Sequence, residues 1–341
     1  MRANEQVYEQ AVAWLDAGET LALATIVRIK GSSSQPLGTR MVIASENRFA
    51  GEVSGGCVES DVYEAAQDVL QDAAPLMLHY KKVEDPLVQI GLNCDGQIDV
   101  LVEPLTRDLY TLLANSGERV NVTLCEPNQP LAPHPLHAQV MPGGEVLGAA
   151  LPGAVVDDAL AALQGDKPVS ITYPDDRVAL LEPIVPPPLL LIFGASERAV
   201  PLVKFAKIMG FHVVVSDARA AFATRERYPD ADDVIAAWPK DVIAQMGVDH
   251  RTYVVSLNHE PRFEDAMLHA LVGCNVAYIG AVGKRTRIAE REARAQEAGF
   301  DLTQLPPIHT PIGLNLGGKS PEEIALSVIA QIIAVKNGRP A

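Results

Sequence analysis

The stretch LLLIFGASERA, residues 189–199, decides the fold of the C-terminal half. An unbroken apolar run ends directly at Gly194, and helix-forming residues continue from Ala199. An apolar run that stops at a glycine turn is typical of a strand buried on both faces of a parallel sheet. The same alternation of strand and helix continues along the chain. This alternation predicts a parallel, doubly wound sheet with helices on both faces.

The hydrophobic periodicity gives the approximate bounds of the elements in this half. We expect strands at 189–194, 211–217, 252–257 and 276–282, and helices at 199–209, 240–246, 261–272 and 284–298. A last helix begins after the N-cap Ser320, with Pro321 as its first residue and Glu323 completing a capping box, and it stops near Gly338. Residues 189–341 are therefore expected to form a Rossmann-like domain.

The N-terminal half has a different pattern, in which short strands and a few helices follow one another without regular alternation. We expect one α+β domain over residues 1–185, with a mixed or antiparallel sheet. The sequence PIVPPP, residues 183–188, cannot continue a helix and predicts a semi-rigid linker between the domains. The expected helices are 4–17, 58–70, 106–114 and 155–163, and the expected strands are 21–29, 41–44, 49–52, 76–80, 98–102, 120–124, 169–173 and 178–184.

The overall charge and composition exclude several classes of protein. The 341 residues carry a formal net charge of -15, whereas nonspecific binding to nucleic acid or anionic lipid requires a positive surface. The N-terminus lacks the features of a signal peptide, and no apolar run reaches membrane-spanning length. The four cysteines lie far apart without a CxxC pair, which argues against a disulfide scaffold or a zinc ribbon. We expect a cytoplasmic protein that binds neither nucleic acid nor membrane.

The turn after the first strand of the C-terminal half is a candidate nucleotide site. Gly194 would make the turn, and Asp217 ends the next strand at the position where an acid binds ribose in dinucleotide-binding folds. Ser196 stands where such folds usually have a second glycine, so its side chain narrows the approach to a pyrophosphate. Two interpretations of this turn remain open. The N-terminus of the following helix binds a phosphate, or the turn has a structural role only.

Three further residues follow later strands of the same sheet. Arg219 and Lys284 are candidates for offsetting phosphate charge, and His259 lies at the carboxyl end of a predicted strand, where open α/β sheets bind their ligands. A histidine there would serve as an acid, a base or a hydrogen-bond donor, although an ordinary loop histidine explains the sequence equally well.

The stretch GEVSGGCVES, residues 51–60, presents Cys57 directly after Gly55 and Gly56, at the expected start of a helix. A thiolate at a helix N-terminus is stabilised by unpaired N–H groups, which makes it a better nucleophile or soft ligand. Cys94 lies in a second glycine-bounded loop, GLNCDG. We expect both thiols to be functional, whereas Cys125 and Cys274 are expected to be packed as small apolar groups.

The turn between residues 31 and 40 adds three serines and the cation Arg40. Together they would line an anion pocket beside Cys57, although serines are also ordinary in a turn that contains proline.

Several stretches, in this order, resemble the XdhC/CoxI family of maturation factors for molybdenum hydroxylases of the xanthine dehydrogenase and carbon monoxide dehydrogenase types. They include TIVRIKGSSSQPLGTRM, AGEVSGGCVES, GLNCDGQIDVLVEPL, LLLIFGASERA, AYIGAVGKRTR and PIGLNLGGKSPEEIALSVIAQII. The family's GGC cysteine falls on Cys57 and its second loop cysteine on Cys94. The family's second loop usually reads Cys-Gly-Gly, whereas this chain has Cys94-Asp95-Gly96.

The resemblance implies a chaperone that binds molybdenum cofactor and is not itself a catalyst, so no catalytic residue is assigned. Such a chaperone protects the cofactor while a cysteine desulfurase supplies its sulfur ligand, and then inserts it into an apo molybdenum hydroxylase. Cys57 and Cys94 would lie next to the molybdenum, with Arg40 or Lys284 as a phosphate anchor. We also expect a homodimer, because two-fold symmetry is the commonest assembly.

Two other functions remain open from the sequence. An NAD(P)-dependent oxidoreductase would use Asp217 to bind ribose and His259 as an acid. A regulatory protein that senses a nucleotide would bind it without consuming it and would need neither cysteine.

Overall fold

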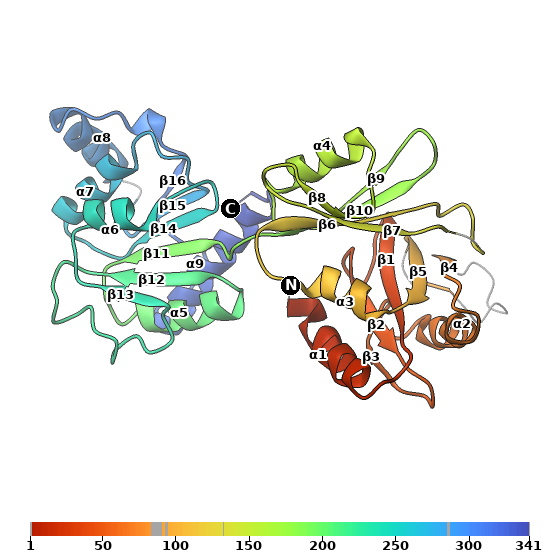
Figure 1. Cartoon of the computed structure of the whole chain (residues 1–341). Helices are drawn as coiled ribbons and strands as arrows, with labels where there is room; N and C mark the ends of the chain where they lie inside the picture. Colours follow the sequence, from red (N-terminus) through yellow and green to blue (C-terminus); the bar gives the residue numbers. More distant parts are fainter. Residues whose placement is uncertain (1, 83–90, 93–94, 132, 285–286, 341) are drawn as a thin grey trace. The chain divides into compact units, whose positions relative to one another are not determined.

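The computed structural model describes the chain except for residues 1, 83–90, 93–94, 132, 285–286 and 341, and it leaves out the side chains of residues 2, 3 and 287. The chain forms two compact units, Met1–Pro186 and Pro187–Ala341 (Figure 1). Each unit has its own sheets and its own hydrophobic core.

The N-terminal unit contains two five-stranded sheets, in which all the paired strands are antiparallel. The sequence predicted a single sheet and did not predict β7 or β8. Across the first sheet the order is β3 (Phe49–Gly51), β2 (Arg40–Ile43), β1 (Ala22–Lys30), β5 (Gln97–Pro104) and β4 (Leu76–Lys81). Across the second it is β8 (Val146–Gly148), β7 (Leu136–Val140), β6 (Arg119–Cys125), β10 (Val178–Ile184) and β9 (Val169–Thr172). The helices are α1 (Arg2–Asp16), α2 (Glu59–Asp72), α3 (Arg107–Ala114) and α4 (Gly153–Ala162).

Apolar side chains between the two sheets explain why there are two. Val27 and Leu101 of the first sheet pack with Val178 and Leu180 of the second in one buried cluster. Cys125 belongs to this cluster, and burial raises the pKa of its thiol to about 12, which keeps the thiol protonated at neutral pH. Helix α2 covers the opposite face of the first sheet, and α4 covers the second sheet.

The proline-rich connection is shorter than the sequence indicated. Pro183 and Ile184 belong to β10, which pairs with β6 along its whole length. Strand β9 pairs with β10 only as far as Leu181, so Pro183 lies where β10 has a neighbour on one side alone. A proline is tolerated there because no ladder hydrogen bond is required on the open side.

The C-terminal unit confirms the predicted doubly wound α/β architecture. Its six strands are all parallel, and their order across the sheet is the order typical of dinucleotide-binding domains. The order is β13 (Asp233–Ile235), β12 (His212–Ser216), β11 (Leu189–Phe193), β14 (Thr252–Ser256), β15 (Tyr278–Ala281) and β16 (Ile308–His309). The helices are α5 (Ala199–Ile208), α6 (Pro239–Met246), α7 (Pro261–Leu271), α8 (Arg287–Glu297) and α9 (Pro321–Lys336), with a short 3₁₀ helix at Leu302–Gln304. The edge strands β13 and β16 are too short to show a pattern in the sequence.

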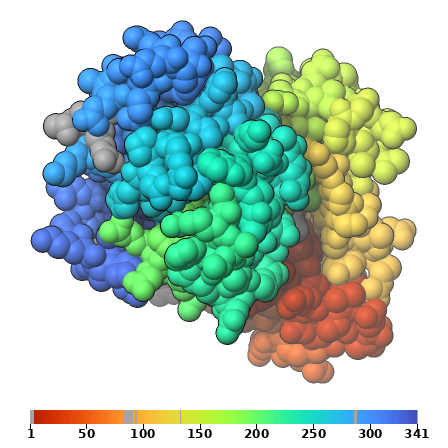
Figure 2. All heavy atoms as spheres, turned by 90° about the vertical axis from the view of Figure 1, so that its left-hand side faces the viewer, coloured from red at the N-terminus to blue at the C-terminus, as the bar shows by residue number. Residues whose placement is uncertain are grey.

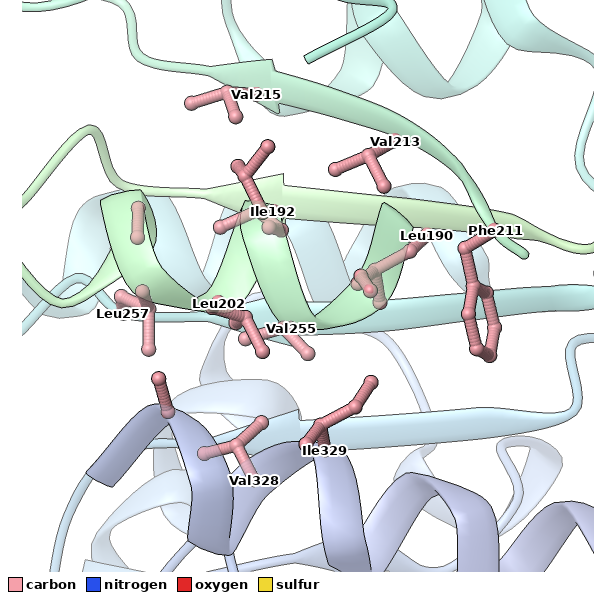
Figure 3. Packing of buried hydrophobic residues seen from close by; sticks show 14 of the residues in the cluster. Leu190, Ile192, Leu202, Phe211, Val213, Val215, Val255, Leu257, Val328 and Ile329 are labelled. Atoms are coloured by element: carbon pink, nitrogen blue, oxygen red, sulfur yellow. The ribbon is translucent and has the colours of Figure 1, made fainter. Parts of the chain in front are cut away.

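Alternate side chains of the central strands face two separate cores. Helices α5 and α9 cover one face, and α6, α7 and α8 cover the other. Figure 3 shows the first core, in which Leu190, Ile192, Val213, Val215 and Val255 pack with Leu202 of α5 and with Val328 and Ile329 of α9. The space-filling view of Figure 2 colours the C-terminal unit from green to blue. Among the helices that the structure describes, none is long and apolar enough to cross a bilayer.

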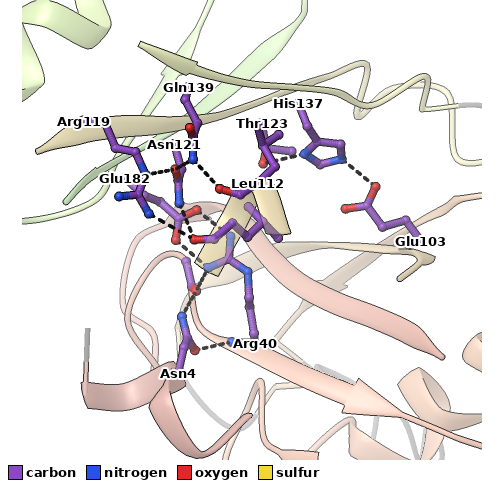
Figure 4. A network of polar contacts seen from close by, with 12 residues as sticks. Asn4, Arg40, Glu103, Leu112, Arg119, Asn121, Thr123, His137, Gln139 and Glu182 are labelled. Atoms are coloured by element: carbon purple, nitrogen blue, oxygen red, sulfur yellow. Dashed lines mark hydrogen bonds and ion pairs between the residues drawn. The ribbon is translucent and has the colours of Figure 1, made fainter. Parts of the chain in front are cut away.

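A buried ion pair joins the two sheets of the N-terminal unit (Figure 4). Arg40 of β2 and Glu182 of β10 are 3% and 7% exposed. The two groups form a bidentate pair, with Nη1–Oε1 and Nη2–Oε2 distances of 2.7 and 2.5 Å. A buried charge that loses its partner is strongly destabilising, so each of these residues depends on the other.

We expect Glu182→Leu to lower the free energy of unfolding of the N-terminal unit by about 3–5 kcal/mol, because it leaves the Arg40 cation buried without a carboxylate. Urea unfolding followed by Trp14 fluorescence in a Trp238→Phe background reports on this unit, since the chain has only these two tryptophans. Replacing both residues, as Arg40→Met with Glu182→Leu, should recover most of the loss. Equal stability of the single variant and the parent would contradict the assignment.

Candidate functional site

The loop before α2 holds Gly55 and Gly56 in backbone conformations that favour glycine. Their φ angles are 75° and 105°, and a Cβ added at Gly56 would meet nothing within 4 Å. Positive φ, and not crowding, is therefore the reason for glycine at this position. The result is an exposed strip of bare backbone directly beside Cys57.

The carboxylate of Glu59, the first residue of α2, fixes this loop. Burial raises the pKa of Glu59, but hydrogen bonds from the Ser54 hydroxyl and from backbone N–H groups outweigh that effect and hold the pKa below its usual range. The loop is thus organised around a charged group of the chain itself. Oε1 accepts from the amides of Val53 and Ser54 at 3.0 and 2.7 Å, and Oε2 accepts from the Ser54 hydroxyl at 2.6 Å and the amides of Gly56 and Val58 at 2.8 and 3.2 Å.

Cys57 lies two residues before α2 and is partly buried against the core beneath that helix. Its amide donates to Ser54 Oγ at 2.9 Å, and the neighbouring amides donate to Ser54 and Glu59. From the sequence, such amides were expected to stabilise a Cys57 thiolate. In the structure, Ser54 and Glu59 accept from the amides of Gly56, Cys57 and Val58, so the role of the Cys57 thiol stays a prediction.

The serine turn predicted to lie beside Cys57 does contact the GGC loop, residues 53–58, which contains Gly55, Gly56 and Cys57. Ser34 Oγ donates to the carbonyl oxygen of Ser54 at 2.6 Å. The same turn also approaches the second glycine-bounded loop, since a Cβ at Gly96 would lie 1.7 Å from the carbonyl oxygen of Ser32. Three loops therefore meet in this part of the unit. Cys94 itself lies outside the described residues, so its position relative to Cys57 stays a prediction.

Arg40 is placed in a different environment from the one expected. Its guanidinium is paired with Glu182 and lines a cavity of about 400 Å³ together with Tyr8, Arg119 and Pro168. Cys57 is not among the residues that line this cavity. Because its charge is already matched by a buried carboxylate, this placement argues against Arg40 as a phosphate anchor.

In the C-terminal unit, Gly194 makes the predicted turn after β11. Its φ is 107°, and an added Cβ would lie 3.0 Å from both the backbone nitrogen and Oδ1 of Asn258. The turn therefore requires glycine for its backbone angle and for the close approach of the loop after β14. This is the point at which the strand order reverses, where α/β sheets bind their ligands.

Asp217 follows β12 and lies beside this turn. Its carboxylate accepts from the amide of Ala195 at 3.1 Å, and it is paired with the guanidinium of Arg219. Burial raises the pKa of Asp217, but the hydrogen bonds from Arg219 and from the Ala195 amide outweigh that effect and hold the pKa below its usual range. The predicted ribose acceptor is therefore occupied by groups of the chain.

The remaining predicted residues of this unit are Ser196, His259 and Lys284. Ser196 donates its amide to the carbonyl oxygen of Gly194 at 2.9 Å, and its buried hydroxyl has no hydrogen-bond partner among the described residues. His259 and Lys284 are exposed and follow β14 and β15, so both lie at the carboxyl edge of the sheet as predicted.

Glu59 and Ser54 accept most of the hydrogen bonds of the loop, and neither residue was predicted from the sequence. An acidic residue at the start of a helix, next to a glycine pair, was the available indication. Its role as the common acceptor of the loop depends on the folded path of residues 53–58.

We expect Glu59→Gln to lower the free energy of unfolding by about 2 kcal/mol, because an amide NH₂ would face N–H donors in place of a carboxylate oxygen. Since the pKa of Glu59 is depressed by folding, its contribution is fully present above the unfolded pKa and is lost as the pH falls through the folded value. The stability difference from the parent should therefore shrink in acid. Thermal unfolding from pH 7 to pH 3 measures it.

Glu52→Gln is the matched control, because Glu52 is exposed and bonds only to Gln35 among the described side chains. Because Glu59→Gln removes the carboxylate that fixes the loop, alkylation of Cys57 should also be faster in this variant than in the control. An unchanged stability and alkylation rate in Glu59→Gln would refute the role of the carboxylate.

Comparison with known proteins identifies the relatives of the chain. A family model described as the XdhC and CoxI family matches residues 14–81, and one described as the XdhC Rossmann domain matches residues 190–332. A Bacillus subtilis protein, named as a probable subunit of xanthine dehydrogenase, is 29% identical, over 95% of this chain and 96% of its own length. The Escherichia coli molybdenum cofactor insertion chaperone PaoD is 24% identical, over 96% of this chain and 86% of its own length.

The fold agrees with these matches. A crystal structure from Bacillus halodurans, described as a xanthine dehydrogenase, has a TM-score of 0.71 and 26% sequence identity, and the match covers 98% of this chain and 96% of that one. The GGC loop lies in the first matched region, and the Gly194 turn lies in the second. The chain belongs to the XdhC and CoxI family.

Proposed function

We propose that this protein is an accessory factor that binds molybdenum cofactor and inserts it into a molybdenum hydroxylase of the xanthine dehydrogenase type. The names of its relatives support this role, since one is a molybdenum cofactor insertion chaperone and another a probable xanthine dehydrogenase subunit. The structural observation that carries the proposal is the GGC loop, which Glu59 fixes so that Cys57 lies beside an open strip of backbone.

The residues of this loop fit such a cofactor. When bound, the cofactor supplies a flat pterin, a phosphate and a metal that its own dithiolene sulfurs already hold. The protein therefore needs a bare surface and a soft neighbour more than a full set of metal ligands. Gly55 and Gly56 provide the surface, Cys57 provides the sulfur, and Cys94 is proposed as the second thiol. Within the described part of the chain, no group of three or more His, Cys, Asp or Glu is placed to hold a metal ion.

We extend the proposal to the partners that the family resemblance implies. The chain would hold the cofactor while a cysteine desulfurase supplies its sulfur ligand, and would then meet the apo hydroxylase in the cytoplasm. A homodimer is proposed as the assembly. The low pI of about 4.9 favours protein partners over nucleic acid, because it leaves the surface with a negative field at neutral pH.

A second function is favoured by one observation in the C-terminal unit. Its strand order and the Gly194 turn favour a small-molecule site at the carboxyl edge of the sheet. Ser196 adds a buried hydroxyl with no partner among the described residues. Nucleotide binding at Gly194, Ser196 and Lys284 is the corresponding proposal, and an NAD(P)-dependent oxidoreductase with His259 as acid is the alternative to the chaperone.

We expect Cys57→Ala to keep its fold but to lose most of the molybdenum cofactor that co-purifies with the parent, because the sulfur beside the open backbone strip is removed. Molybdenum and pterin content per chain measure retention, and circular dichroism checks the fold. Cys94→Ala should show the same loss if both thiols act together.

Cys274→Ala serves as the matched control, since Cys274 is also partly buried but packs in the core of the C-terminal unit. A Cys57→Ala protein that retains cofactor and activates an apo hydroxylase as well as Cys274→Ala does would exclude Cys57 from the site. Turnover of a nicotinamide cofactor by both variants would instead favour the oxidoreductase.

A further inference from the structure

The segment after β12 presents two cations on one exposed aromatic ring. Arg219 stacks on Phe222 with its Cζ 4.3 Å from the ring centroid, and Arg227 approaches the same ring at 5.5 Å. Phe222 is 40% exposed, and the side chain of Arg219 is 44% exposed. An exposed aromatic ring with two guanidinium groups close to it is a surface suited to an anion attached to a flat ring.

The acid next to this surface has no acceptor left for a ribose hydroxyl. A carboxylate offers about four lone-pair sites, and Asp217 receives four hydrogen bonds from Ala195 and Arg219. Oδ1 accepts from the amide and Nε of Arg219 at 3.0 and 2.9 Å, and Oδ2 accepts from the amide of Ala195 and from Nη2 of Arg219 at 3.1 and 2.9 Å. The usual recognition of an unmodified ribose by this acid is therefore blocked.

The surface is fixed to the Gly194 turn at two points. The first is the hydrogen bond between Asp217 and the amide of Ala195. The second is the hydroxyl of Tyr228, which donates to the carbonyl oxygen of Ser196 at 3.0 Å. Because Tyr228 is buried and directly follows Arg227, the two cations keep a defined place beside the turn.

Arg219 is paired with Asp217, but its side chain is 44% exposed, whereas Arg40 is buried together with its carboxylate. Glu260, whose charge acts on Arg219, is paired with Arg262 at 2.8 Å. Asp217 uses Nε and Nη2 of Arg219, which leaves Nη1 outside that pair. Arg227 donates from Nη1 to the carbonyl oxygen of Phe222 at 3.4 Å. This acceptor is neutral, so the contact does not neutralise the guanidinium.

We propose that Arg219, Phe222 and Arg227 form a phosphomonoester site, and that the nucleotide bound by this unit carries a phosphate on its ribose 2′ position. In dinucleotide-binding folds the acid after the second strand binds the 2′-hydroxyl, whereas a nearby arginine accommodates a 2′-phosphate. Here the acid is occupied and the arginine beside it is exposed. The inference rests on the nucleotide binding proposed for the C-terminal unit and is independent of Cys57.

The test uses two pairs of probes that differ only in the 2′-phosphate. Isothermal titration of the full chain with 2′,5′-ADP and 5′-AMP, and then with NADPH and NADH, should give at least about tenfold tighter binding of the 2′-phosphorylated member of each pair. Arg219→Ala should lose this preference, and Arg227→Ala should reduce it without disturbing Asp217.

Arg177→Ala is the matched control. Arg177 forms the same kind of pair with the aspartate two positions before it, but it lies in the N-terminal unit. Equal affinities within each pair, or an unchanged preference in both Arg219→Ala and Arg227→Ala, would overturn the inference. So would the absence of binding by all four probes. None of these results would affect the cofactor retention measured with Cys57→Ala, so the two proposals fail separately.

Discussion

Carboxylates withdrawn from water organise the loops of this protein. A carboxylate that leaves water must receive hydrogen bonds or a cation, because an unmatched buried charge is strongly unfavourable. Glu59 receives them from the loop that carries Cys57, and Asp217 receives them from the Gly194 turn and from Arg219. In both cases the donors hold the pKa of the acid below its usual range. The conformation of each loop is therefore tied to the charge of one side chain.

This constraint changes how the candidate sites are understood. Backbone amides near Cys57 would be an anion site if they were open, but Ser54 and Glu59 already accept from them. What remains is an exposed glycine strip beside a partly buried sulfur, a surface suited to a flat ligand more than to a small anion. In the C-terminal unit, Asp217 already accepts from the Ala195 amide, which is why the proposed phosphate site lies at the arginines after β12.

The two units reach stability in different ways. The C-terminal sheet is buried on both faces by helices, so its strands are almost wholly apolar. The N-terminal unit packs one sheet on another and also contains polar connections, among them the pair of Arg40 with Glu182 and the contacts of Arg119 with carbonyl oxygens near the end of α3 (Figure 4). Cations near the last turn of a helix interact favourably with its dipole, which gives Arg119 a structural role.

The sequence by itself determined the doubly wound C-terminal domain, the change of pattern near the prolines and the glycine loop that carries Cys57. These features follow from local periodicity and from backbone angles that neighbouring residues reveal. Only the tertiary structure decided that Arg40 is matched by Glu182, because the two residues are 142 positions apart. It also decided that the N-terminal domain has two sheets and that Asp217 is saturated by its neighbours. Hydrogen bonds and ion pairs depend on where the folded chain places each donor, and no periodic pattern in the sequence indicates that placement.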